Sequence, residues 1–211
     1  MMKGLLTKDA LIIKKYCIYN FIITALFFVI SIYSNNSSFF LYYSAAMISL
    51  IPITVFAYDE GAKWSRYEAI LPMKKSVSVT EKYLLLLILV VPAVIIFGAL
   101  SAVRNELNFN DAVINAGVIF ISSSIAPCIA FPIIFKFGYL KGRIINVIII
   151  AVMVAFITAL TSVKNTLEFE NAEITINPFI FIIIPFAILA ISYLISVSYT
   201  HLRAHETVLD L

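Results

Sequence analysis

Charged residues are scarce in this 211-residue sequence. Asp, Glu, Lys and Arg make up 13% of it, and apolar residues, counting Tyr, Trp and Cys, make up 62%. A typical soluble domain carries about 25% charged residues. This deficit excludes an ordinary soluble domain and places the chain among integral membrane proteins.

Residues that usually build metal or redox sites are also few. The two cysteines, Cys17 and Cys128, lie far apart in apolar segments, so no disulfide framework is expected. The two histidines, His201 and His205, both lie near the C-terminus, and no HExxH motif occurs. We therefore expect no metal site, no catalytic residues and no cofactor bound by this chain.

A nucleotide-binding loop is likewise absent, because no GxxxxGK[ST] motif occurs. If the protein uses ATP, a separate polypeptide must bind and hydrolyse it together with Mg²⁺. The sequence therefore predicts that this chain is not itself an enzyme.

Long apolar runs dominate what is present. A helix of about 20 apolar residues crosses the hydrocarbon core of a bilayer, and a run that is apolar on every face favours a helix over a barrel strand. Six such runs predict an all-α membrane protein with six transmembrane helices: Tyr16–Ser34, Phe39–Tyr58, Tyr83–Val103, Ala112–Phe135, Ile144–Val163 and Pro178–Val197. None holds Asp, Glu, Lys, Arg or His between its ends, which argues against a proton- or ion-coupled carrier.

Prolines interrupt most of these runs. The fourth run contains Pro127 and Pro132 on either side of Cys128, with three serines just before them. Such a segment is either a broken, mobile helix or a helix with kinks that its neighbours tolerate.

Basic residues predict the orientation. Of the 15 Lys and Arg residues, all but Arg104 and Lys164 fall on one side of the six predicted spans. Basic loops face the cytoplasm, so both termini are expected inside. The basic N-terminal segment is either a helix lying at the membrane surface or a simple topology signal.

The densest charged segment, Asp59 to Lys75, lies between the second and third runs and contains the only Trp. Read as one helix from Asp59 to Leu71, it places Glu60, Trp64, Tyr67 and Leu71 on one stripe. Lys63 and Arg66 flank that stripe, Glu68 points toward it, and Pro72 ends the helix. An aromatic ridge of this kind fits either a membrane-surface anchor or a protein docking surface.

Two stretches carry a family resemblance: KGLLTKD near the start, and YDEGAKWSRYEAILPMKKSVSVTEKY in the first basic loop. They resemble the small six-span permease subunits of the ABC-2 type transporter family, in particular bacterial permeases that export amphipathic peptides from Gram-positive cells. The resemblance implies an N-terminal interfacial helix and a cytoplasmic coupling helix between spans two and three.

The resemblance also implies partners and a site. A cytoplasmic ABC ATPase subunit would bind the coupling helix, and two permease chains, identical or paralogous, would form the pathway in the bacterial plasma membrane. Membrane lipid is a partner and nucleic acid is not. The residues implied to couple to the ATPase are Asp59, Glu60, Lys63, Trp64, Tyr67, Glu68, Leu71 and Pro72.

The expected cargo is amphipathic or apolar, such as a peptide, because the runs hold no charge; Tyr42, Tyr43 and Ser44 are expected near the outer end of its pathway. The alternatives are a non-transporting scaffold or self-protection protein and, less favoured, a secondary carrier. Residues 1–197 are predicted to form one transmembrane domain. Residues 198–211 depart from the family pattern; the segment Tyr199 to Leu211 reads as non-native read-through or, alternatively, as a genuine polar tail.

Overall fold

A computed structural model describes residues 2–33, 37–71, 75–142, 144, 148 and 178–209. These residues form helices and contain no strand, which confirms the all-α prediction. The helices are α1 (Met2–Tyr16), α2 (Ile18–Tyr33), α3 (Ser37–Ser49), α4 (Ile51–Gly61), α5 (Trp64–Ile70), α6 (Lys75–Arg104), α7 (Phe109–Phe137) and α9 (Ile180–Leu209).

Within the described part of the chain, four helical stretches are long and apolar enough to cross a membrane: Phe40–Gly61, Ser76–Arg104, Phe109–Phe137 and Ile180–Thr200. A fifth span arises if α1 and α2, which meet at a 66° bend, are counted together. Almost all of the predicted span Ile144–Val163 falls outside the described residues. The count of six spans therefore stays a prediction.

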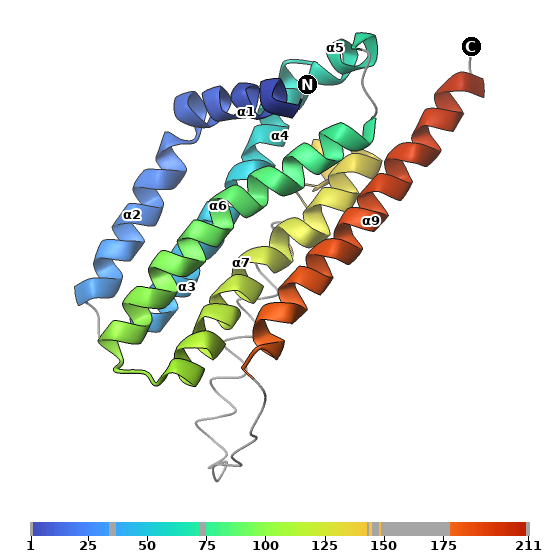
Figure 1. Cartoon of the computed structure of the whole chain (residues 1–211). Helices are drawn as coiled ribbons and strands as arrows, with labels where there is room; N and C mark the ends of the chain where they lie inside the picture. The colour runs from blue at the N-terminus through green and yellow to red at the C-terminus, as the bar shows by residue number, and fades with distance from the viewer. Residues whose placement is uncertain are drawn as a thin grey trace.

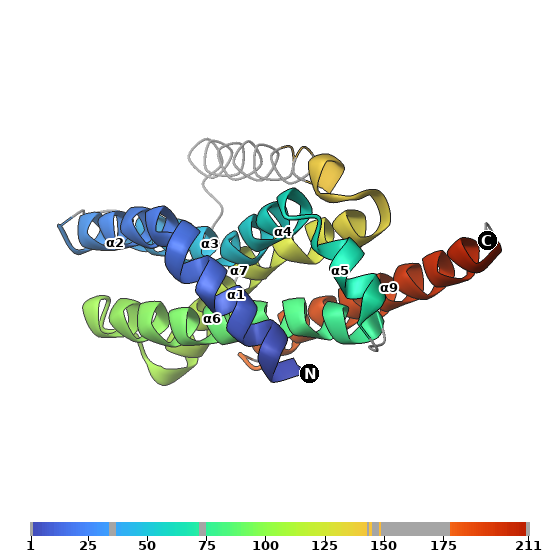
Figure 2. The same cartoon turned by 90° about the horizontal axis from the view of Figure 1, so that it is seen from above.

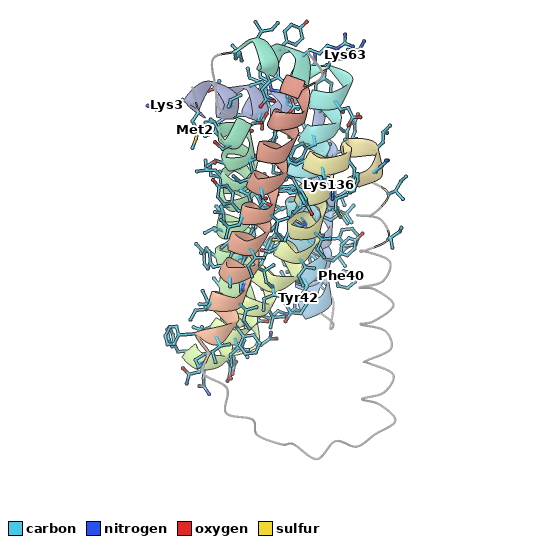
Figure 3. The ribbon with its side chains drawn as sticks, turned by 90° about the vertical axis from the view of Figure 1, so that its right-hand side faces the viewer. Met2, Lys3, Phe40, Tyr42, Lys63 and Lys136 are labelled. Atoms are coloured by element: carbon cyan, nitrogen blue, oxygen red, sulfur yellow. The ribbon has the colours of Figure 1, made fainter. Side chains whose placement is uncertain are left out.

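The long helices run side by side, and α1 lies across one end of the bundle (Figure 1). Both chain ends and α5 lie at that same end, and Figure 2 shows α1 crossing over the bundle when it is viewed from there. Lys3 and Lys63 lie toward this end, whereas Phe40 and Tyr42 lie toward the other (Figure 3). Lys3 and Lys63 both belong to the side that the sequence predicts to be cytoplasmic, and the orientation itself stays a prediction.

The core near the α1 end is built on Phe131 of α7, which is fully buried. The rings of Phe56 on α4 and Tyr83 on α6 meet it edge-on, with centroids 5.4 Å and 5.1 Å away. Edge-to-face aromatic pairs of this kind stabilise packing beyond the area they bury. The inner ends of three spans are thereby fixed relative to one another.

The close contact between α7 and α9 depends on a small residue, Gly117. A Cβ atom added to Gly117 of α7 would lie 2.5 Å from the Cβ of Phe181 on α9. Small residues let helix backbones approach in membranes, where the hydrophobic effect does not drive helices together. Gly117 therefore allows α7 and α9 to pack tightly.

The proline-rich fourth run forms one continuous helix, α7, with Pro127 and Pro132 both inside it. Ser122 and Ser123 donate their hydroxyls to the carbonyls of Ile119 and Phe120. The structure therefore favours tolerated prolines over a broken helix.

The charged segment differs from its prediction as one helix over Asp59 to Leu71. Helix α4 carries on out of the second run to Gly61, Lys63 takes a left-handed conformation (φ 53°), and α5 begins at Trp64. Gly61 has a low helix propensity, and a left-handed residue cannot continue an α-helix. Glu60 and Trp64 therefore lie on different helices, and the predicted four-residue stripe does not form.

The end of α5 follows the prediction more closely. Leu71 is extended (ψ 138°) after the helix ends at Ile70. The residue before a proline is disfavoured in the helical region, so Pro72 explains this end. Pro72 itself lies outside the described residues.

Candidate functional site: an ion-pair cluster beside α5

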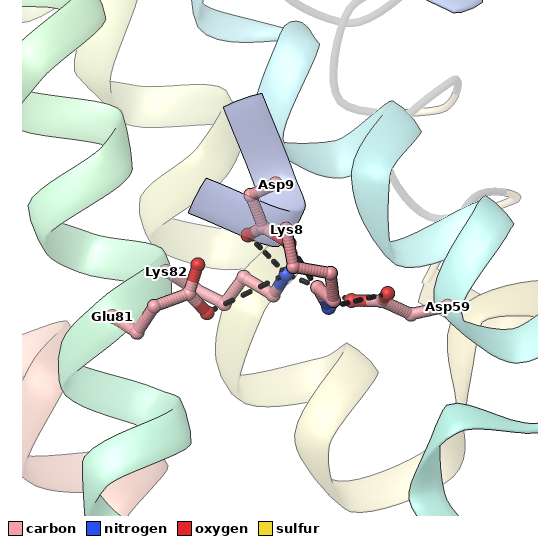
Figure 4. A network of polar contacts seen from close by, with 5 residues as sticks. All are labelled: Lys8, Asp9, Asp59, Glu81 and Lys82. Atoms are coloured by element: carbon pink, nitrogen blue, oxygen red, sulfur yellow. Dashed lines mark hydrogen bonds and ion pairs between the residues drawn. The ribbon is translucent and has the colours of Figure 1, made fainter. Parts of the chain in front are cut away.

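Five charged side chains from three helices meet where α1 crosses the bundle (Figure 4). They are Lys8 and Asp9 of α1, Asp59 of α4, and Glu81 and Lys82 of α6. We refer to these five residues as the ion-pair cluster. It joins the N-terminal helix to the inner ends of two spans.

Each aspartate of the cluster bridges the two lysines. Lys82 Nζ lies 2.6 Å from Asp9 Oδ2 and 2.8 Å from Asp59 Oδ2. Lys8 Nζ lies 2.6 Å from Asp59 Oδ1 and 2.9 Å from Asp9 Oδ1. Glu81 is further away, with its Oε2 3.5 Å from Lys82 Nζ. The four short pairs form a closed ring.

Three residues of the cluster are shielded from solvent, since Asp9, Glu81 and Lys82 are 0%, 1% and 2% exposed, whereas Lys8 and Asp59 are partly exposed. Buried charges are costly unless they are paired. Burial alone would raise the pKa of the Asp9 carboxyl, but its hydrogen bond with Glu81 and the charges of Lys82 and Lys8 outweigh that effect. The pKa of Asp9 is therefore below its ordinary value, and Asp9 stays ionised.

Aromatic rings connect the cluster to its neighbours. Lys8 Nζ lies 4.4 Å from the ring centroid of Trp64, and Lys82 Nζ lies 5.3 Å from that of Phe56. A cation over an aromatic face is attracted by the ring. The contact with Trp64 extends the cluster to α5, so four elements meet at this point.

The structure separates the predicted coupling residues into two groups. Asp59 lies in the ion-pair cluster, and Glu60 accepts a hydrogen bond from the backbone N–H of Tyr139 at 2.7 Å. Tyr139 follows Gly138, which ends α7 with a φ of 87°. Asp59 and Glu60 thus hold other parts of the same chain, namely α1, α6 and the segment after α7.

The other group lies on and around α5. Trp64 is half-buried against Lys8, whereas Tyr67 and Leu71 are 62% and 42% exposed, and Lys63 is also exposed. Glu68 is half-buried; burial raises its pKa, partly opposed by a hydrogen bond with Ser78 and by the charges of Lys8 and Lys82. Tyr67 and Leu71 are the predicted residues most available to a partner.

Sequence reasoning missed Lys8, Asp9, Glu81 and Lys82 as site residues and used the basic ones only to set the topology. One signal was available in the sequence: Asp59–Glu60 and Glu81–Lys82 directly adjoin predicted runs, and Lys8–Asp9 lies six residues before the first run. The predicted topology places all three pairs on the same side of the membrane. Opposite charges at the same membrane depth can pair.

Polar side chains also connect the spans themselves. The hydroxyl of Tyr83 lies 2.5 Å and 2.8 Å from those of Ser192 and Ser196, and Ser192 donates to the carbonyl of Cys128. Toward the outer end, Tyr42 donates to Asn115, which in turn donates to Ser101. These hydrogen bonds connect α6 to α9 and α7, and they connect α7 to α9 and α3.

An apolar cavity of about 350 Å³ lies between α6, α7 and α9. Its walls include Gly98, Ala116, Phe120 and Phe186, but none of Tyr42, Tyr43 and Ser44. Tyr43 instead packs against Phe27, and Ser44 is buried. The described residues hold no group of His, Cys, Asp and Glu side chains suited to a metal ion.

The fold and the cluster define a multi-pass helical membrane protein whose N-terminal helix lies across one end of the bundle and is ion-paired there to α4 and α6. The sequence matches the family described as ABC-2 family transporter protein over residues 4–200. The chain therefore belongs to the ABC-2 transporter family and is a membrane component of that kind of transporter. No curated protein and no solved structure matches it.

Proposed function

We propose that this chain is the permease subunit of an ATP-binding-cassette transporter that exports an amphipathic or apolar substrate such as a peptide. A separate cytoplasmic ATPase subunit, carrying ATP and Mg²⁺, would supply the energy. A second copy or a paralogue would complete the pathway in a bacterial plasma membrane, with α1, α5 and both termini on the cytoplasmic side. Family membership supports the permease role.

The observation that carries the coupling role is the position of α5. It exposes Tyr67, Ile70 and Leu71 at the end of the bundle, although this short helix stands outside the apolar spans. Exposed Tyr and neighbouring apolar side chains are typical anchors of a protein interface. We infer that this ridge docks on the ATPase.

The ion-pair cluster supports a route by which movement of the bound ATPase would pass from α5 to the spans. Asp59 is two residues from the end of α4 and contacts α1 and α6. A push on α5 would therefore reach three other helices, first through the contact of Trp64 with Lys8 and then through short charged contacts that are largely shielded from solvent. Packed elements of this kind switch between discrete arrangements. The helices that the ion pairs join would therefore move together.

The docking hypothesis is tested by Tyr67→Ala combined with Leu71→Ala in the full-length chain. Truncating interface anchors costs about 2 kcal/mol, roughly thirtyfold in binding. We expect the double variant to lose the ATPase on co-purification in detergent while its helices stay folded. The matched control is Val103→Ala, an exposed apolar residue at the other end of α6.

Full retention of the ATPase by the double variant would contradict the docking assignment and leave α5 as a membrane-surface anchor. Binding of the ATPase without ATP-dependent export in proteoliposomes would favour a scaffold or self-protection role. Export driven by an ion gradient without any ATPase would favour a secondary carrier.

A further inference from the structure

The ion-pair cluster holds more carboxyl groups than amines. Asp9, Asp59 and Glu81 face Lys8 and Lys82, so full ionisation would leave one negative charge in a buried site. Uncompensated buried charge is strongly unfavourable. One additional proton in the cluster would make its charges equal.

Two oxygens of the cluster indicate where that proton lies. Asp9 Oδ1 and Glu81 Oε1 are buried, and neither has a hydrogen-bond partner among the described residues. Asp9 Oδ1 has only its ion pair with Lys8, which lacks hydrogen-bond geometry. A proton shared between the two carboxyl groups would give each of these oxygens a hydrogen-bond partner.

The two unpartnered oxygens belong to carboxyl groups of one cluster, and a hydrogen bond from Glu81 to Asp9 would lower the pKa of Asp9. An ionised carboxylate only accepts hydrogen bonds, so the donor must be a protonated carboxyl. Asp9 has both lysines within 2.9 Å, whereas Glu81 has only Lys82, at 3.5 Å. The lysines keep Asp9 ionised, and Glu81 is the group that carries the proton.

We propose that Glu81 holds a proton, donates it in a hydrogen bond to Asp9, and thereby keeps α1 attached to α6. When α1 separates from α6, the Glu81 proton passes to water and leaves two carboxylates. The cluster is then a proton-sensitive lock on the N-terminal helix. This goes beyond the permease role and holds with or without an ATPase.

The charged and titratable groups that face Glu81 come from each helix around it. Lys8 and Asp9 of α1 and Lys82 of α6 act on Glu81 directly, and Asp59 of α4 and Glu68 of α5 act on the same two lysines. The low pKa of Asp9 means that it titrates only in acid, below the ordinary value of about 3.9. Glu68 is the other carboxyl of the set that requires a control.

The proton count sets the direction of the pH effect. At neutral pH the attached state holds one proton that a detached, solvated Glu81 would lack. The ratio of attached to detached α1 therefore falls as pH rises, by at most about tenfold per pH unit. Attachment is strongest in mildly acidic solution.

Trp64 provides the readout, because it is the only Trp in the chain and its ring lies 4.4 Å from Lys8 Nζ of α1. The emission of Trp64 is measured against pH in the purified full-length protein in nanodiscs. We expect a one-proton transition in the wild type and a flat profile in Glu81→Gln, which keeps a donor at all pH values. Glu68→Gln, the matched control on α5, should keep the transition.

Infrared spectra give a second measurement, whose wild-type result does not depend on any variant folding. Protein labelled with ¹³C at glutamate should show the C=O stretch of a protonated Glu carboxyl at neutral pH, and Glu81→Gln should lack it. The proposal is overturned if the wild type lacks this band. It is also overturned if the pH transition of Trp64 is absent, survives Glu81→Gln, or disappears in Glu68→Gln.

Discussion

At the scale of single residues, Lys82 is the amine on which most of the cluster depends. It is 2% exposed and reaches both aspartates, and its hydrocarbon stem ends over the ring of Phe56. A charged residue is rarely buried this deeply unless its partners compensate for lost hydration. Here Asp9 and Asp59 provide that compensation.

Replacing Lys82 by Met should therefore destabilise the protein strongly. The substitution keeps the length of the side chain but leaves Asp9 and Asp59 with only Lys8. Breaking a buried ion pair by removing one partner typically costs about 3–5 kcal/mol. Thermal unfolding of the full-length protein in detergent measures the effect as a lowered midpoint.

Lys3→Met is the matched control, because Lys3 is an exposed lysine on α1. Surface substitutions usually change stability by no more than about 0.5 kcal/mol. Equal unfolding midpoints for the Lys82 and Lys3 variants would show that the cluster contributes nothing to stability.

At the scale of elements, the apolar runs were predictable and the joints between helices were not. Hydropathy alone predicts α6, α7 and α9, because a helix inside a membrane is apolar on every face. The predicted spans ended at Tyr58 and began at Tyr83, yet the apolar helical stretches reach Gly61 and start at Ser76. Charged residues at the inner ends were therefore assigned to loops although they sit on spanning helices.

The division between α4 and α5 shows why the stripe over Glu60 and Trp64 failed. The prediction of the stripe required one uninterrupted helix from Asp59 to Leu71, but the backbone turns at Lys63. The residues on either side of the turn contact residues distant in the sequence. Glu60 accepts a hydrogen bond from the Tyr139 N–H, and the Trp64 ring contacts the Lys8 ammonium group. Such tertiary contacts leave no periodic signal in the local sequence, so spacing alone could not reveal them.

At the scale of the whole molecule, the polarity of the bundle is the property that function requires. The termini, α1 and α5 all lie at one end (Figure 1), and the basic asymmetry of the sequence predicts that this end is cytoplasmic. Single cysteines placed at each end test this orientation. Suitable positions are Lys63, before α5, and Asn110, at the start of α7, both of which are exposed.

In intact cells, a membrane-impermeant thiol reagent should label Asn110→Cys and leave Lys63→Cys unlabelled until the membrane is opened. The two native cysteines are buried, and the wild-type chain serves as the control for their background. Labelling of Lys63→Cys from outside, with Asn110→Cys protected, would reverse the proposed orientation.

The central claim is that α5 receives the ATPase and the ion-pair cluster transmits its movement to the spans. Export per ATP hydrolysed, measured with Asp59→Asn permease and its ATPase in proteoliposomes, tests this most directly. Asp59 is internal and pairs with Lys8 and Lys82, so we predict normal ATPase binding, continued hydrolysis and a large loss of export per ATP. Wild-type export per ATP in Asp59→Asn would contradict transmission through the cluster, and loss of ATPase binding would instead make Asp59 a direct contact.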